Sequence, residues 1–171
     1  MRPTTDMARQ AIFDMLAGAA NGARVLDLCA GAGTLGIEAL SRGAREAVFV
    51  EQDRDACAII LQNLEATGLR SSGHIRRADV LRFLTRTPRM AFDLVFLDPP
   101  YSRGLGFVSR VLGKIGGGNW ANPGATVVVE APEGDVEWPP DMREIKNRRF
   151  GRTRVSLAVV DEHESDLPRN V

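Results

Sequence analysis

The arrangement of apolar and polar positions switches repeatedly between two patterns along the chain. Short, nearly continuous apolar runs are typical of strands that are buried on both faces of a parallel sheet. They predict strands at 24–29, 47–51, 74–78, 92–97 and 125–130. Between the runs, apolar residues three or four positions apart predict helices. These helices are expected from Thr4 or Thr5 as the cap, at 34–41, from Asp53 or Asp55 to Gly68, at 80–85 and at 107–115.

The last part of the chain has a different pattern. Residues 143–150 and 153–160 flank Gly151-Arg152, which predicts an antiparallel hairpin. Alternating strands and helices predict an α/β fold with a mostly parallel sheet and helices on both faces. The terminal hairpin adds an antiparallel edge to that sheet. We expect one domain over residues 1–160 and a polar tail over 161–171.

The charge distribution adds one local feature to this prediction, a candidate basic patch. The 171 residues carry a formal net charge of zero, which argues against non-specific binding to polyanions. A nucleic-acid contact therefore requires a basic patch, and the dense run at 146–154 supplies one, with Arg148, Arg149 and Arg152 as candidate RNA-binding residues. The alternative is a solvated hairpin edge, where basic side chains discourage pairing between sheets.

Cysteine and hydropathy patterns exclude other classes. Cys29 and Cys57 lack metal-ligand spacing and are interpreted as small buried hydrophobes, so no metal is expected. No apolar run approaches the roughly 20 residues that span a bilayer, and the polar N-terminus does not resemble a signal peptide. These features predict a cytoplasmic protein without a membrane contact, and nothing in the sequence demands more than a monomer.

A glycine-rich turn follows the first predicted strand. Gly31, Gly33 and Gly36 match G-x-G-x-x-G, a turn that lets the backbone approach a nucleotide-like ligand. In an open α/β sheet such ligands bind beyond the carboxyl ends of the strands. This match alone does not identify the ligand, because several nucleotide-like ligands bind at such a turn.

Three flanking carboxylates narrow the choice. Asp27 lies at the end of the first strand, where it would repel a pyrophosphate but could hold an amino group. Glu51 can accept hydrogen bonds from ribose hydroxyls, and Asp79 can accept one from an adenine amino group. Together they predict S-adenosylmethionine as the cofactor; alternatively, Asp27 is a local cap and Asp79 only a helix N-cap. The candidate cofactor-binding residues of these segments are Asp27, Cys29, Ala30, Gly31, Ala32, Gly33, Glu51, Gln52, Asp79 and Val80.

A second motif, Asp98-Pro99-Pro100-Tyr101, directly follows the apolar run at 92–97. The Asp98 carboxylate and the Pro99 carbonyl can accept the hydrogens of a conjugated amine and free its lone pair to attack a methyl group. Proline fixes φ and removes a competing donor. Tyr101 offers a ring on which a base can stack. These four residues are the candidate catalytic residues.

These motifs resemble those of class I S-adenosylmethionine-dependent methyltransferases that modify amino groups. With Arg2-Pro3-Thr4-Thr5-Asp6 and the segment 38–44, they resemble more narrowly the RsmD family, which methylates the N2 amino group of a guanine in small-subunit (16S) ribosomal RNA. The resemblance runs from Arg2 to about Val160. It implies a Rossmann-like, seven-stranded sheet with an antiparallel last strand.

The resemblance also implies a cofactor pocket closed by the helix after Thr4 and Thr5, which adds both threonines to the cofactor candidates. It implies ribosomal RNA or an assembling small subunit as the partner. Family members usually begin with a basic, glycine-containing segment before the Arg-Pro-Thr motif, and this chain starts at that motif. We therefore expect either a truncated sequence or a protein without an arm that could hold RNA.

Other functions fit parts of the pattern. The proline motif also suits methylation of adenine N6 in DNA or RNA, or of a protein amide, because each acceptor is a conjugated nitrogen. A nicotinamide-dependent oxidoreductase could use the glycine turn, although Asp27 and the proline motif argue against it. A non-catalytic RNA-binding module is the remaining alternative.

Overall fold

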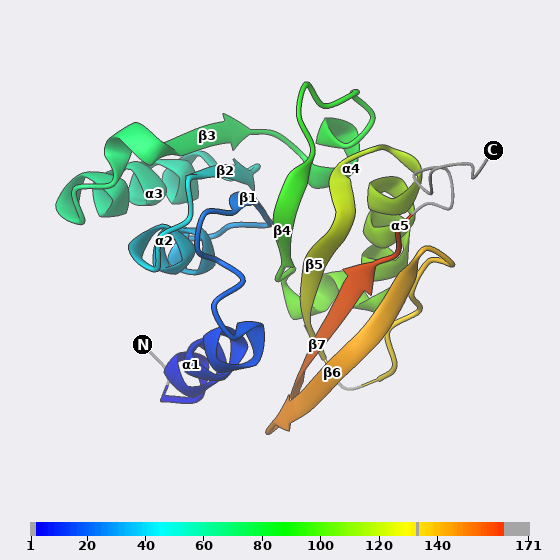
Figure 1. The fold of residues 1–171 in the computed structure, drawn as a ribbon. Helices are drawn as coiled ribbons and strands as arrows, with labels where there is room; N and C mark the ends of the chain where they lie inside the picture. Colours follow the sequence, from blue (N-terminus) through cyan, green and yellow to red (C-terminus); the bar gives the residue numbers. More distant parts are fainter. Residues whose placement is uncertain (1–2, 133, 163–171) are drawn as a thin grey trace.

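Seven strands form one twisted sheet with helices on both faces (Figure 1). The computed structural model describes residues 3–132 and 134–162, with side chains from Asp6 onward. The strands are β1 (Arg24–Leu28), β2 (Glu46–Glu51), β3 (Gly73–Arg77), β4 (Phe92–Leu97), β5 (Ala121–Pro132), β6 (Met142–Phe150) and β7 (Thr153–Val160). The helices are α1 (Pro3–Leu16), α2 (Thr34–Ser41), α3 (Arg54–Ala66), α4 (Val80–Phe83) and α5 (Gly104–Gly117), with 3-10 turns η1 (Arg70–Ser72) and η2 (Tyr101–Arg103).

The strand order is β3-β2-β1-β4-β5-β7-β6. Strands β1 to β5 run parallel, β7 is antiparallel to β5, and β6 is antiparallel to β7. The predicted fold class, a mostly parallel seven-stranded sheet with a terminal antiparallel hairpin, is confirmed. The chain order reverses between β1 and β4, and in such sheets the crevice beyond the carboxyl ends of these strands is where ligands bind.

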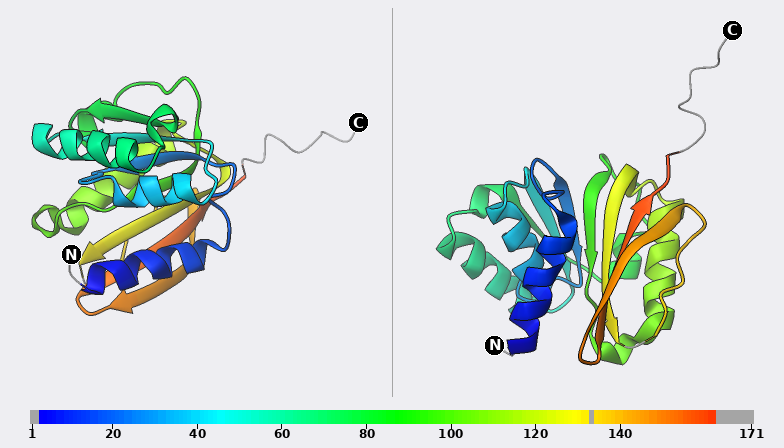
Figure 2. Two further views of the ribbon diagram at one scale, coloured as in Figure 1. Left: turned by 90° about the vertical axis from the view of Figure 1, so that its left-hand side faces the viewer. Right: turned by 60° about the horizontal axis from the view of Figure 1, so that its bottom comes forward.

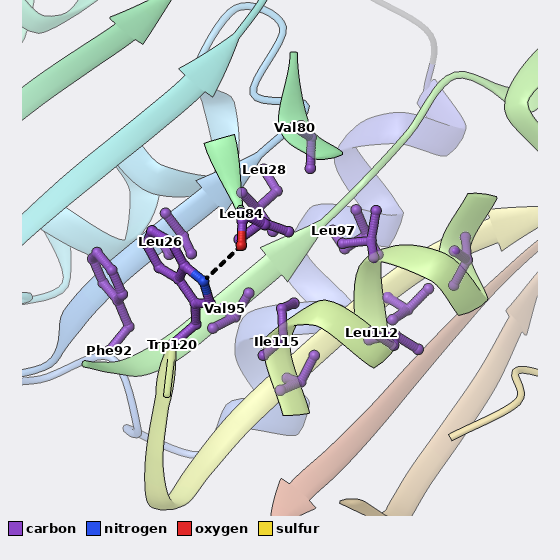
Figure 3. Packing of buried hydrophobic residues seen from close by; sticks show 14 of the residues in the cluster. Leu26, Leu28, Val80, Leu84, Phe92, Val95, Leu97, Leu112, Ile115 and Trp120 are labelled. Atoms are coloured by element: carbon purple, nitrogen blue, oxygen red, sulfur yellow. Dashed lines mark hydrogen bonds between the residues drawn. The ribbon is translucent and has the colours of Figure 1, made fainter. Parts of the chain in front are cut away.

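One face of the sheet packs against α4 and α5. Helix α5 presents Val108, Val111, Leu112 and Ile115 to this face, at the spacing of one helical stripe. Trp120 closes the cluster, and its indole N–H donates a hydrogen bond to the Leu84 carbonyl at 3.3 Å (Figure 3). The buried indole donor is therefore satisfied.

The opposite face packs against α1, α2 and α3. Ile12 and Phe13 of α1 and Ile60 of α3 are buried there, and the Phe13 and Phe96 rings lie 5.8 Å apart. Figure 2 shows α1 and the tip of the β6–β7 hairpin on the same side of the molecule. Lys146, in the middle of β6, links this strand to α1 by a 3.0 Å hydrogen bond from its ammonium group to the Met15 carbonyl.

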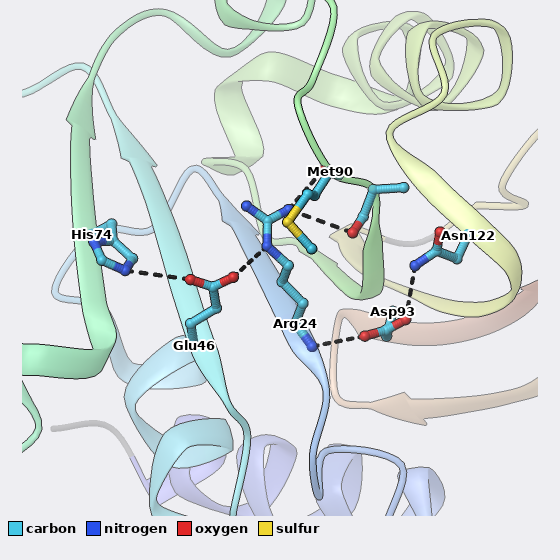
Figure 4. Close-up of polar contacts among 7 residues, drawn as sticks. Arg24, Glu46, His74, Met90, Asp93 and Asn122 are labelled. Carbon is cyan, nitrogen blue, oxygen red and sulfur yellow. Dashed lines mark hydrogen bonds and ion pairs between the residues drawn. The ribbon is translucent and has the colours of Figure 1, made fainter.

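The amino ends of the central strands are tied by a polar network (Figure 4). The Arg24 guanidinium is hydrogen-bonded to Glu46, and the Arg24 backbone N–H donates to Asp93 at 2.9 Å. The Asn122 side-chain amide donates to the other Asp93 oxygen at 2.9 Å, and His74 Nε2 lies 3.4 Å from Glu46 Oε2. This network aligns the starts of β1, β2, β4 and β5, at the edge opposite the candidate site.

Sequence and structure differ mainly at element ends. Helix α1 begins at Pro3, so Thr4 and Thr5 lie in its first turn and not before it; their side chains are outside the described part. Strand β5 begins at Ala121, earlier than predicted, because Ala121 pairs with Phe92 across a register shift. The polar tail that the sequence predicts falls largely on 163–171, outside the described residues.

Gly36 allows α2 to approach the sheet closely. A methyl group at this position would lie 2.9 Å from the Phe49 ring atom Cζ and 3.0 Å from Asp27 Oδ2. Both neighbours are fully buried, so neither has room to move. The third glycine of the motif is therefore required for helix–strand packing.

We expect Gly36→Ala to destabilise the fold by about 1–3 kcal/mol, because overpacking in a dense core displaces side chains. Gly113→Ala is the matched control in α5, where an added methyl group meets nothing within 4 Å. That control should be neutral or stabilising by up to about 1 kcal/mol. Chemical denaturation of both variants measures the difference, and equal stabilities would contradict the packing role of Gly36.

Candidate active site

Four carboxylates lie at or near the carboxyl ends of four neighbouring strands, and all four point to one face of the sheet. Along β1, Leu26 and Leu28 point to the α4–α5 face, so Asp27 between them points to the opposite face. The same alternation, in β2, β4 and β5, directs three further acids to that face, at or near the carboxyl ends of these strands: Glu51, Asp98 and Glu130. Because the strands are parallel, all four groups meet at the carboxyl edge.

These side chains surround a cavity of about 460 Å³. Most residues predicted from the sequence line it: Asp27, Cys29, Ala30, Gly31, Ala32, Glu51, Gln52, Asp79, Val80, Asp98, Pro99, Pro100 and Tyr101. The lining also includes residues that the sequence analysis missed: Arg9, Thr34, Leu35, Ala78, Arg103, Phe107 and Glu130. The two motifs are therefore brought into one site.

The glycine turn presents backbone to the cavity. Gly31 has φ +58°, and its N–H donates to Glu51 Oε2 at 2.8 Å. Cys29 also has a positive φ, +58°, which is uncommon for a residue with a side chain. Gly33, with φ +79°, does not line the cavity: it lies against Ile60 of α3 at the start of α2. Its place in the motif is explained by the turn and by packing.

Asp27 is the most buried of the acids, with 1% of its surface exposed. Burial raises the pKa of its carboxyl to about 8, although the Gly36 N–H, which donates to Oδ2 at 2.9 Å, acts in the opposite direction. No described ion pair involves this carboxyl. A buried carboxyl of this kind gains most from a cationic ligand.

Glu51 and Asp79 both hold backbone in place. The two Glu51 oxygens accept from Gly31 and Asp53, and each keeps a second lone pair for a ligand. Asp79 is the N-cap of α4, where its Oδ1 accepts from the Arg82 N–H at 3.0 Å. Asp79 is therefore a helix N-cap, as one of the two interpretations from the sequence predicted, and it also lines the cavity.

The proline motif forms the mouth of the cavity. Asp98 follows β4 directly and is half-buried, and Pro99 is buried beneath it. Burial, followed by the charges of Glu130 and Asp27, raises the pKa of the Asp98 carboxyl to about 8. Tyr101 is 56% exposed, and its hydroxyl is hydrogen-bonded to the Thr153 hydroxyl at the start of β7. The ring is thus available at the surface and anchored at its tip.

Glu130 could have been found from the sequence. It closes the apolar run predicted at 125–130, and an acid at the end of such a run is the pattern that indicates Asp27 and Glu51. Arg9 could not have been found in this way, because the position of α1 relative to the sheet depends on tertiary packing.

The basic hairpin tip lies beyond the same edge. Because β7 is antiparallel to β5, its first residue, Thr153, pairs with Pro132 at the end of β5. Arg148 and Arg149 are exposed on β6 and Arg152 is exposed in the turn, outside the cavity. The Arg148 guanidinium lies 5.3 Å from the Phe150 ring centroid.

Both cysteines are half-buried, so the prediction that they are buried hydrophobes is wrong. Cys29 lines the cavity because its positive φ turns the chain outward at the end of β1. The Cys57 thiol donates to the Glu51 carbonyl at 3.4 Å. Within residues 3–132 and 134–162, no cluster of three or more His, Cys, Asp or Glu side chains could hold a metal ion. Among these residues, no helix is long and apolar enough to cross a membrane.

The chain is similar to curated ribosomal RNA methyltransferases. It is 35% identical to "Ribosomal RNA small subunit methyltransferase D" of Escherichia coli over 77% of this chain and 64% of the relative. It is 42% identical to "Putative rRNA methyltransferase YlbH" of Bacillus subtilis over 58% of this chain and 55% of the relative. The chain thus spans less than two thirds of the length of these relatives.

Solved structures share the fold. The Escherichia coli protein described as "Putative methyltransferase yhhF" superposes with a TM-score of 0.86 at 29% identity, over 95% of this chain and 89% of that one. A conserved hypothetical protein of Streptococcus pyogenes superposes at 0.76 with 34% identity, over 90% and 95%. The family described as "Conserved hypothetical protein 95" matches residues 1–159. This match covers the sheet, the cavity and the hairpin, and the chain belongs to that family, as its resemblance to RsmD predicted.

Proposed function

We propose that the protein is an S-adenosylmethionine-dependent methyltransferase that modifies the N2 amino group of a guanine in small-subunit ribosomal RNA. The observation that carries the proposal is the placement of Asp98-Pro99-Pro100-Tyr101 at the mouth of an acid-lined cavity. The names of the curated relatives support ribosomal RNA as the substrate class. We further propose that residues 1–160 act as one domain and as a monomer in the cytoplasm.

The cavity has the properties that this cofactor requires. Five acidic side chains line it, and only Arg9 and Arg103 among its lining residues carry a permanent positive charge, so a cationic ligand is favoured. We assign Asp27 to the amino group, Glu51 to the ribose and Asp79 to the adenine amino group. Leu35 and Val80, both buried, offer apolar surface to the rings. When bound, the cofactor supplies an electrophilic methyl group next to a sulfur leaving group.

The residues of the catalytic loop orient the acceptor amine. An ionised Asp98 oxygen and the Pro99 carbonyl accept the two amine hydrogens, which favours a nitrogen lone pair that is free to attack. Tyr101 holds the base by stacking, worth roughly 1–3 kcal/mol. Alignment of the nitrogen with the methyl group is the principal contribution to rate.

The hairpin tip is the proposed RNA contact. Arg148 and Arg152 are exposed near Thr153, and the Thr153 hydroxyl is hydrogen-bonded to the Tyr101 hydroxyl. Phosphate groups bound there would bring the nucleic acid next to the base-stacking ring.

The reaction is tested by methyl transfer from labelled cofactor to small ribosomal subunits, naked 16S ribosomal RNA and DNA, followed by nucleoside analysis. We expect label in N2-methylguanosine. Asp98→Ala should lower turnover roughly 100-fold or more and leave cofactor affinity unchanged, because its carboxylate acts on the acceptor. Asp55→Ala, an exposed residue of α3, is the control. Label confined to N6-methyladenine would contradict the guanine assignment.

Asp27→Asn tests the buried carboxylate. Its raised pKa means that the folded wild type holds a proton which the unfolded chain releases near pH 4, so wild-type stability falls as pH rises from about 4 to 8. The amide does not titrate. We expect the stability of the variant relative to wild type to increase by roughly 3–4 kcal/mol between pH 5 and pH 8, and cofactor affinity to fall.

Thermal unfolding across this pH range and calorimetry with S-adenosylmethionine measure both effects. Asp55→Asn is the control, and its difference from wild type should stay constant. A pH-independent difference for Asp27→Asn would mean that the buried carboxyl does not hold the extra proton. Binding of NAD in place of S-adenosylmethionine would overturn the methyltransferase assignment.

The double variant Arg148→Gln/Arg152→Gln tests the hairpin. Loss of two phosphate contacts should weaken RNA binding and reduce the slope of log affinity against log salt by about 1–2. Arg149 is left unchanged, so that the variant removes two of the three candidate contacts. Arg86→Gln, exposed in the loop before β4, is the control. An unchanged salt slope would exclude the hairpin tip as the RNA contact.

A further inference from the structure

Asp98 and Glu130 form a pair of carboxyl groups inside the site. Leu97 of β4 pairs with Val129 of β5 in parallel register, so the next residue of each strand extends beyond the same rung. Both side chains point to the α1–α3 face, both are half-buried, and both line the cavity. The register and the shared face therefore place the two carboxyl groups side by side in the wall of the cavity.

A hydrogen bond between two carboxyl groups requires a proton. Two carboxylates in contact repel each other strongly, so one of them keeps a proton over a wide pH range. A proton shared in this way would leave one Asp98 oxygen free to accept from a ligand. The backbone fixes both groups, because Asp98 directly follows β4 and Glu130 lies within β5, where it is paired with Val155 of β7.

The surroundings do not neutralise the pair. On β7 the residue paired with Glu130 is the apolar Val155. The other ionisable groups that line the cavity are Asp27, Glu51, Asp79, Cys29, Tyr101, Arg9 and Arg103. The negative charge of Asp27 adds to that of Glu130 at Asp98.

We propose that Glu130 is a positioning residue for the proposed methyl transfer: it shares one proton with Asp98, fixes the orientation of that carboxyl and controls when it ionises. The inference rests on the proposed function for its chemical role. The shared proton itself is a property of the protein alone. Burial and the Glu130 charge, which raise the pKa of Asp98 to about 8, are consistent with it.

The pair also accounts for the proton released in the reaction. The amine nitrogen forms a bond to the methyl carbon, and the sulfur–carbon bond breaks with its electron pair remaining on sulfur. The nitrogen then loses one proton, which passes to the ionised Asp98 oxygen. The pair holds two protons at this point and returns one to solvent before the next turnover.

The shared proton is tested without cofactor or RNA, by carbon NMR titration of protein labelled at the Asp and Glu side-chain carboxyls. In the wild type, the Asp98 and Glu130 signals should each respond to the same two titration steps. In Glu130→Gln, the Asp98 midpoint should move down by about one pH unit or more, because a like charge is removed while burial stays. Glu65→Gln, exposed on α3, is the matched control and should leave the Asp98 midpoint unchanged.

Independent, single-step titrations of Asp98 and Glu130 in the wild type would overturn the inference, as would an unchanged Asp98 midpoint in Glu130→Gln. The wild-type titration decides the question even if the variant does not fold. In the methyl-transfer assay, Glu130→Gln should shift the acid limb of the single-turnover rate to lower pH and reduce its plateau roughly tenfold. Absence of methyl transfer with a coupled titration would overturn only the proposed function; methyl transfer with uncoupled titrations would overturn only the role of Glu130.

Discussion

The site depends on one constraint, the convergence of strand ends in a parallel sheet. Apolar side chains bury β1, β2, β4 and β5 on both faces, and each of these strands has an acid at or near its carboxyl end, on the same face. The carboxylates cannot move apart, because the ladder of backbone hydrogen bonds fixes the strands that carry them. Their mutual repulsion and their burial are costs of folding that a cationic ligand would relieve.

The opposite edge of the sheet shows the contrasting arrangement. There the carboxylates of Glu46 and Asp93 each have a cationic or amide partner, and their network binds together the starts of the strands. The same residue type therefore serves two purposes, which are distinguished by its partners. At the amino ends, carboxylates paired with side-chain cations or amides join the strands, whereas the carboxylates that face the cavity have no described ion pair.

Much of this arrangement could be predicted from the sequence, and the limits have physical causes. Strand β4 and helix α2 have the predicted bounds, because an uninterrupted apolar run and a glycine turn leave few alternatives. The early start of β5 could not be predicted, since Asn122-Pro123-Gly124 reads as a turn and enters the sheet only through pairing with β4. Gly33 was assigned to the cofactor, because the motif does not distinguish a glycine that faces a ligand from one that packs against Ile60. Residues that reach the site by helix docking, such as Arg9, leave no local pattern.

Tyr101 is the only tyrosine in the chain. Both tryptophans lie elsewhere: Trp120 is buried under the sheet, and Trp138 donates a hydrogen bond to Glu144. Uniform incorporation of fluorotyrosine would consequently place a single fluorine label in this chain, on the ring that links the loop after β4 to the basic hairpin. The Tyr101 ring would thus serve as a spectroscopic reporter without any engineered mutation. Its single fluorine resonance would respond both to a base stacking on the ring and to a change in the contact with the hairpin.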